Sequence, residues 1–137
     1  MIQRPALTAA DAERIIRAAE AEATKNGWAV TIAICDDGGH LLCLKRLDGA
    51  PPVSATIAPR KAITSAIGRR ESGAYEKMVN EGRVSFLSVD AVTPLEGGAP
   101  IVVDGCCVGA IGVSGVKSSE DLQIARAGIA ALESSCD

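Results

Sequence analysis

The stretch VTIAICDDGGHLLCLKRLDGA, residues 30–50, decides the predicted fold. Val30, Ile32 and Ile34 alternate with smaller residues, and apolar residues spaced two apart are typical of a strand. The run Asp36–Gly39 interrupts this pattern, and its glycines supply the positive φ angles that a tight turn needs. The stretch therefore predicts a β-hairpin, with strands at residues 28–35 and 41–47.

Upstream of this hairpin the sequence predicts a helix from about Ala9 to Asn26. Thr8 is the expected N-cap, and Asp11, three residues on, is an acidic variant of the capping-box partner. Apolar residues at helical spacing mark the face that the helix buries. This stripe consists of Ala12, Ile15, Ile16, Ala19 and Ala23.

Downstream of the hairpin, helices are predicted at residues 54–67 and 72–80, and a last helix begins near Ser118. Pro59 lies inside the first of these spans, so it either belongs to the first turn of a shorter helix or bends the longer one. Asp104-Gly105 predicts a second hairpin turn. Its strands are expected at residues 101–103 and 108–114.

The resulting order, α-β-β-α-α-β-β-α, predicts an α+β fold. We expect an antiparallel sheet of about five strands, with the first and last helices packed together on one face. The 137 residues contain no repeat, low-complexity tract or linker, so residues 1–137 are expected to form one domain.

Composition excludes several classes of function. With 2% aromatic residues and a net charge of -3, the chain has neither stacking platforms nor a basic stripe for nucleic acid. No apolar run is long enough to span a membrane, and no signal core follows Met1, so a cytoplasmic location is expected. The positive mean hydropathy indicates apolar surface that a homo-oligomer would bury.

The five cysteines, an odd number, do not indicate a disulfide framework. Cys35 and Cys43 fall on predicted strands, where cysteine usually packs as a small apolar residue. The adjacent Cys106 and Cys107 cannot both point to one face of a strand. A zinc site would need histidines or further cysteines at suitable spacing, and the chain has one histidine.

Four segments together resemble the GlcG/HbpS family, whose domain also forms the C-terminal part of PduO-type proteins. The first is the hairpin stretch quoted above. The other three are RKAITSAIG (60–68), PLEGGAPIVVDGCCVGAIGVSG (94–115) and SSEDLQIARAG (118–128). Residues 69–92 carry little of the family's pattern, and Cys106-Cys107 is unusual in its second hairpin.

The resemblance implies a profilin-like sheet, a homo-oligomer and a role in binding or degrading haem. It also implies an alternative, because some members are found beside catabolic genes for small organic acids or aromatic compounds. Fold alone does not decide between these roles.

Arg46, Asp48, Lys61 and Thr64 are the candidate ligand-binding residues. Arginine binds carboxylates bidentately, and Lys61 and Thr64 are three residues apart on one helix face. A strand end, a turn and a solvated helix surface explain the same residues without a ligand. The family resemblance favours the functional interpretation, in which the four form a site for an anion.

His40, Cys106 and Cys107 are the candidate catalytic residues. His40 is the only conventional nitrogen ligand for haem iron, although a hairpin turn is also an ordinary solvent-exposed position. A cysteine nucleophile would need His40 beside Cys106 or Cys107. First-turn capping already explains Glu120 and Asp121. The glycines of residues 97–100 and 109–115 match no nucleotide-binding pattern and are expected where the backbone closely approaches another element, a subunit or a flat ligand.

Two functions therefore stay open. The first is an oligomeric protein that binds, and in one version degrades, haem or a similar planar acid near a subunit interface. The second is a cofactor-independent hydrolase, isomerase or decarboxylase acting on a small carboxylate. A subunit with a structural role and no chemistry is a third possibility, because the sequence has no evident catalytic dyad.

Overall fold

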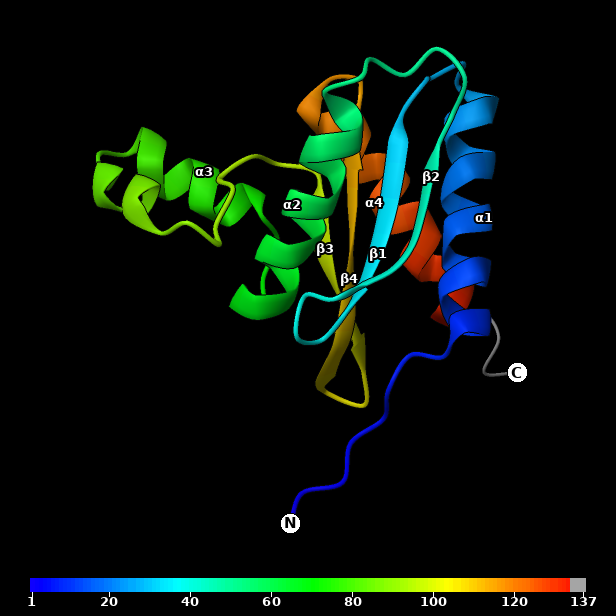
Figure 1. The fold of residues 1–137 in the computed structure, drawn as a ribbon, viewed down its shortest axis with the longest axis horizontal. Helices are drawn as coiled ribbons and strands as arrows, with labels where there is room; N and C mark the ends of the chain where they lie inside the picture. Colours follow the sequence, from blue (N-terminus) through cyan, green and yellow to red (C-terminus); the bar gives the residue numbers. More distant parts are fainter. Residues whose placement is uncertain (134–137) are drawn as a thin grey trace.

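The computed structural model describes residues 1–133, and four strands in these residues form one antiparallel sheet (Figure 1). Its strand order is β2-β1-β4-β3. The strands are β1 (Thr31–Asp36), β2 (Leu41–Arg46), β3 (Gly98–Val103) and β4 (Cys106–Ser114). Both predicted hairpins are present, so the antiparallel α+β class is confirmed.

The expected count of about five strands was wrong, because the described residues contain four. The segment between the two hairpins contributes no strand. Residues Val84–Ser88 form the short 3-10 helix η1, and the loop that follows contains Pro94, which has no amide hydrogen for a strand ladder. The two hairpins therefore account for the whole sheet.

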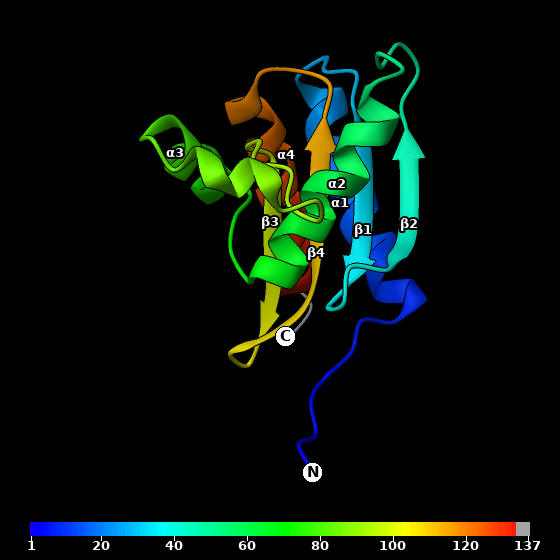
Figure 2. The same ribbon diagram turned by 60° about the vertical axis from the view of Figure 1, so that its left-hand side comes forward.

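The helices lie on both faces of this sheet (Figures 1 and 2). As predicted, the two terminal helices pack side by side on one face, and α2 covers the other. The helix α3 and η1 extend beyond α2, away from the sheet (Figure 1). The helix bounds are α1 (Ala9–Lys25), α2 (Ser54–Gly68), α3 (Gly73–Asn80) and α4 (Ser118–Glu133).

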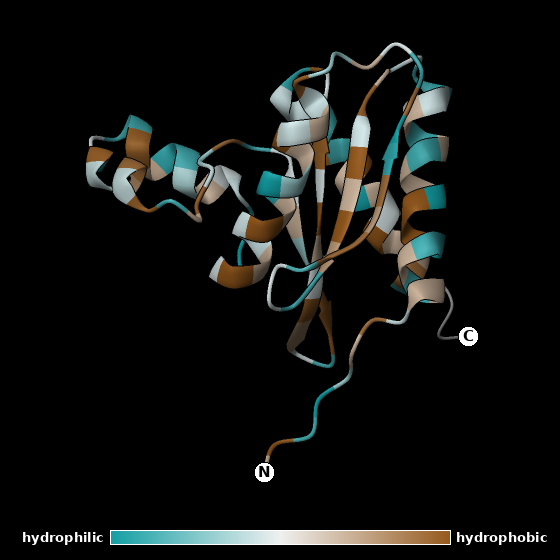
Figure 3. Cartoon of the chain, viewed as in Figure 1, coloured by the Kyte–Doolittle hydropathy of each residue, from teal (hydrophilic) through white to brown (hydrophobic). Residues whose placement is uncertain are grey.

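The larger core lies between the sheet and the two terminal helices. The side chain of Thr8 accepts a hydrogen bond from the Asp11 amide, and Asp11 accepts one from the Thr8 amide, so the predicted capping box forms. Apolar and polar residues alternate along α1 in Figure 3. The predicted stripe of α1 is buried in one core with Val30, which precedes β1, and with β-branched residues of the strands, which are Ile32, Ile34, Ile101, Ile111 and Val113.

The α2 face of the sheet is lined by small side chains instead. Its buried cluster consists of Ala33, Cys35, Ala58, Ala62, Ala66 and Ala110. A Cβ on Gly112 would collide with the Ala58 carbonyl and the Ala62 amide, so this glycine lets α2 lie directly on β4. Pro59 lies within the longer α2, beyond its first turn. The close approach expected of the glycines is therefore to a neighbouring helix.

Candidate functional site

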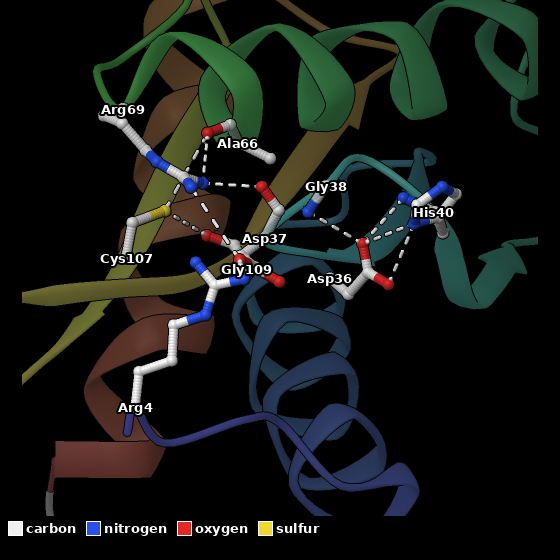
Figure 4. A network of polar contacts seen from close by, with 9 residues as sticks. All are labelled: Arg4, Asp36, Asp37, Gly38, His40, Ala66, Arg69, Cys107 and Gly109. Atoms are coloured by element: carbon white, nitrogen blue, oxygen red, sulfur yellow. Dashed lines mark hydrogen bonds and ion pairs between the residues drawn. The ribbon is translucent and has the colours of Figure 1, made fainter. Parts of the chain in front are cut away.

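The β1–β2 turn holds His40 in a defined orientation (Figure 4). The ring Nδ1 lies 3.1 Å from each carboxylate oxygen of Asp36. The backbone amides of Gly38 and His40 both donate to the Asp36 Oδ1 at 2.9 Å. The tautomer that donates from Nδ1 to Asp36 leaves the Nε2 lone pair free, an arrangement typical of histidines that bind metals.

The exposure of His40 makes that free nitrogen accessible. Its side chain is 81% exposed, and Nε2 has no hydrogen-bond partner among residues 1–133. The pKa of Asp36 is lowered, chiefly by the hydrogen bond from the backbone amide of His40, so Asp36 is a carboxylate at neutral pH. The negative charge favours the tautomer with hydrogen on Nδ1. Asp36 was not among the sequence candidates, although its position four residues before His40 in a hairpin turn indicates the contact.

A second polar cluster lies beside this turn (Figure 4). The Asp37 carboxylate forms ion pairs with Arg4 at 2.9 Å and with Arg69 at 3.7 Å. Arg69 also donates to the backbone carbonyls of Asp37 and Ala66. The cluster joins the N-terminal segment, the turn and the C-terminus of α2.

The two adjacent cysteines occupy half-buried positions at the start of β4. The Cys107 thiol donates to the Gly109 carbonyl at 3.4 Å and lies 3.9 Å from the Ala66 carbonyl. Among the described residues neither Cys106 nor Cys107 forms a hydrogen bond with His40, so no hydrogen-bonded cysteine–histidine dyad is present. A catalytic role for these three residues stays a prediction.

The remaining described cysteines are also free. Burial is the largest cause that raises the pKa of Cys35 to about 12, so this thiol is neutral. Cys43 packs against the core as a partly buried residue. Cys136 lies outside the described residues. No group of three or more metal-binding side chains is found within residues 1–133.

Arg46 and Asp48 lie at the far end of β2 from His40. Arg46 is exposed, pairs with Thr31 in the sheet register and donates to the Ala50 carbonyl at 2.9 Å. Asp48 is exposed in the turn that follows. Both side chains are therefore open to a ligand from solvent.

Lys61 is buried and faces another way. Its Nζ donates to the Val113 carbonyl at 2.9 Å and to Asp121 Oδ2 at 3.1 Å. The backbone amide of Val116 donates to the other oxygen of Asp121 at 3.2 Å. Burial raises the pKa of Asp121, and the charge of Lys61 acts in the opposite direction. This ion pair joins α2 to the first turn of α4, which sequence spacing did not indicate.

Thr64 is also buried, with internal partners. Its hydroxyl donates to the Arg60 carbonyl and accepts a hydrogen bond from the Thr93 amide, both at 2.8 Å. The structure therefore gives Arg46, Lys61 and Thr64 separate partners. A shared contact of the four predicted residues with one ligand stays a prediction.

An apolar surface lies between the two ends of β2. Leu41 and Leu44 pair with Cys35 and Ala33, whose side chains lie under α2, so both leucines face the α2 side. The β1–β2 turn contacts α2 at Ile63 and Ile67, which lie next to Gly39. Leu41 and Ile67 are 56% and 42% exposed. We call Leu41, Leu44, Ile63 and Ile67 the β2–α2 surface; His40 adjoins one end of it and Arg46 the other.

The chain belongs to the HbpS-like family, described as haem degrading proteins, because the family's model matches residues 7–130. The chain is 54% identical to Escherichia coli protein GlcG over 103 residues, which cover 75% of this chain and 77% of the relative. A double mutant of Streptomyces reticuli HbpS superimposes with a TM-score of 0.89 at 34% identity, covering 96% of this chain and 90% of that one. A crystal structure of a PduOC:heme complex gives 0.85 at 28% identity, with 93% and 95% covered.

No helix within residues 1–133 has the length and apolar character needed to cross a membrane.

Proposed function

We propose that this protein binds haem, or a similar planar acid, on the β2–α2 surface at a contact between subunits. The observation that carries the proposal is His40, whose Nδ1 is held by Asp36 while Nε2 faces solvent. The apolar residues Leu41 and Ile67 lie beside the same turn. Membership of the HbpS-like family and the similarity to a PduOC:heme complex support the choice of ligand.

The residues present fit the chemistry of haem. A bound haem supplies an iron that accepts a nitrogen ligand, an apolar ring face and two carboxylates. His40, the only histidine, would provide the nitrogen, and Asp36 would hold its tautomer. Arg46 and Arg60 are exposed cations near the β2–α2 surface and would bind the carboxylates.

A second subunit would cover the ligand's outer face. The β2–α2 surface is aliphatic and open, and η1 presents further exposed apolar residues. Val84 and Leu87 of η1 are each 62% exposed. Apolar surface of this kind on a small domain favours association of copies, because water is then excluded from it. We therefore place the ligand near an interface of a homo-oligomer.

The exposed Arg46 and Arg60 also favour a second candidate, an enzyme acting on a small carboxylate. A small acid would use the cations but would not need the nitrogen of His40. Replacing His40 therefore distinguishes the two functions.

The test is a spectroscopic titration of the purified protein with haem. We expect the Soret band to shift and to saturate at about one haem per subunit or per dimer. His40→Ala should abolish the shift or weaken binding by about tenfold or more, and Asp36→Asn should weaken it by about tenfold, as is typical for the partner of a metal-binding histidine. Arg17→Ala is the control, because Arg17 is exposed on α1, on the opposite face of the sheet. Unchanged haem affinity in His40→Ala would overturn the proposal. Progressive loss of the Soret band after adding a reductant in air-saturated buffer, and no loss without dioxygen, would identify oxidative degradation.

A further inference from the structure

A cavity of about 400 Å³ lies on the face of the sheet that carries α1 and α4. It is found at the N-terminal end of α1 and the C-terminal end of α4. Its volume falls within the range of small-molecule sites, about 300–1,000 Å³. Four parts of the chain form its walls: the N-terminal segment, α1, the β3–β4 hairpin and α4. The apolar lining consists of Pro5, Ala6, Leu7, Ile101, Val102, Val103, Val108, Ile129 and Leu132.

The N-terminal wall of this cavity is fixed at two points. Arg4 forms an ion pair with Asp37 in the β1–β2 turn at 2.9 Å. Three residues on, Leu7 packs against the core, and a Cβ on Gly109 would collide with its side chain. Pro5 and Ala6 lie between these anchors, and proline restricts the backbone further. The cavity is therefore closed on this side by a segment with defined positions.

The charged residues of the lining are three carboxylates and one guanidinium, namely Asp11, Asp104, Glu133 and Arg14. Arg14 donates to the Ala131 carbonyl at 3.3 Å and lies 3.9 Å from the Asp11 carboxylate, which balances its charge. The pKa of Asp11 is lowered, chiefly by the hydrogen bond from the Thr8 amide, so Asp11 is ionised at neutral pH. Asp104 and Glu133 are exposed and have no ion-pair partner in residues 1–133.

We infer that this cavity binds a small apolar molecule with a cationic end, such as an aliphatic primary ammonium ion. The apolar walls would bury the alkyl chain, and Asp104 and Glu133 would attract the charged group. A carboxylate of the same size would meet the net negative charge of the lining. This site is separate from the proposed haem site and does not depend on it.

The test compares three probes of equal length with the full chain: hexylammonium, hexanol and hexanoate. Calorimetric titration at low salt should give binding of hexylammonium about tenfold or more tighter than that of hexanoate, with hexanol between them. In methyl NMR spectra, hexylammonium should shift the signals of Val108 and Ile129, and those of Ile63 and Ile67 should stay in place. Equal or tighter binding of hexanoate, no binding of hexylammonium, or shifts confined to the β2–α2 surface would overturn the inference.

Two kinds of variant separate the walls from the charge. Val103→Trp should fill the cavity and abolish binding of hexylammonium and hexanol. Arg4→Ala removes one anchor of the N-terminal wall without adding bulk, and it should weaken the binding of both probes. The double variant Asp104→Asn/Glu133→Gln should reduce the preference for hexylammonium over hexanol by about threefold or more. Val89→Trp, far from the cavity, is the control. Binding that none of these changes affects would place the ligand elsewhere.

Discussion

The amino group of Lys61 and the carboxylate of Asp121 form an ion pair inside the protein, with Nζ 3.1 Å from Oδ2. Their side chains are only 4% and 3% exposed. The Val113 carbonyl accepts a further hydrogen bond from Lys61, and the Val116 amide donates one to Asp121. A buried charge is tolerated when its partner and its hydrogen bonds are both in place. The pair therefore joins α2 to α4 as long as neither member is removed.

Removing one member of this pair should destabilise the protein. We expect Lys61→Met to lower the free energy of unfolding by about 3–5 kcal/mol, because Asp121 is then buried without a cation. The double variant Lys61→Met/Asp121→Leu should lose less, since neither charge remains. Urea unfolding followed by circular dichroism measures both. A loss below about 1 kcal/mol in the single variant would show that Lys61 contributes no structural ion pair.

Acid should weaken the fold through Asp36. The pKa of Asp36 is lowered from its ordinary value of 3.8, chiefly by the hydrogen bond from the backbone amide of His40. Near that pH the folded chain therefore binds fewer protons than the unfolded chain. Asp36 thus stabilises the fold above that pH, and the stabilisation is lost as the pH falls through the folded-state pKa. Urea midpoints measured from about pH 3 to 7 should show a smaller acid dependence in Asp36→Asn. An identical pH dependence in the two proteins would contradict this.

Arg46 tests the ligand site from the end opposite His40. Arg46→Ala should weaken binding of the ligand, which is haem or a similar planar acid, by about 1.5–3 kcal/mol, because a charge-assisted hydrogen bond is lost. Folding should change little, because Arg46 is exposed and its side chain donates only to the nearby Ala50 carbonyl among residues 1–133. Paired titrations with circular dichroism as the folding control measure this. Wild-type affinity in the variant would leave His40 as the residue to test and remove Arg46 from the site.

The exposed apolar surfaces predict self-association. Light scattering at micromolar protein should give at least the mass of a dimer. Leu44→Glu and Leu87→Glu, which place a charge on the β2–α2 surface and on η1, should lower the mass toward that of a monomer. Val102→Glu is a matched control, because Val102 is similarly exposed, at 50%, but lies on the opposite edge strand β3. A monomeric wild-type protein would contradict the oligomer outright.

Within the candidate site, the sequence indicated exposed positions for His40 and Arg46, because a hairpin turn and a strand end are exposed in most folds. The structure confirms their exposure, and their contact with a ligand stays a prediction. The sequence did not predict their partners, which are Asp36 for His40 and the Ala50 carbonyl for Arg46. Lys61 was expected to meet a ligand together with Thr64 because the two residues share a helix face. The structure turns that face toward β4 and the loop containing Thr93, where both side chains have internal partners.

The sequence by itself determined the order of the elements, the two hairpins and the capped first helix. These depend on interactions between near neighbours, such as Thr8 with Asp11 or the turn at Asp36–Gly39. Such interactions can be predicted from the spacing of apolar residues and from the residues that favour turns. Tertiary structure alone decided the number of strands, the direction in which Lys61 points and the cavity behind the N-terminal segment. Each of these requires contacts between residues far apart in the chain, as between Lys61 and Asp121 or Leu7 and Gly109. The spacing of residues within one segment does not indicate which distant surfaces come into contact, because those contacts depend on the packing of the whole core.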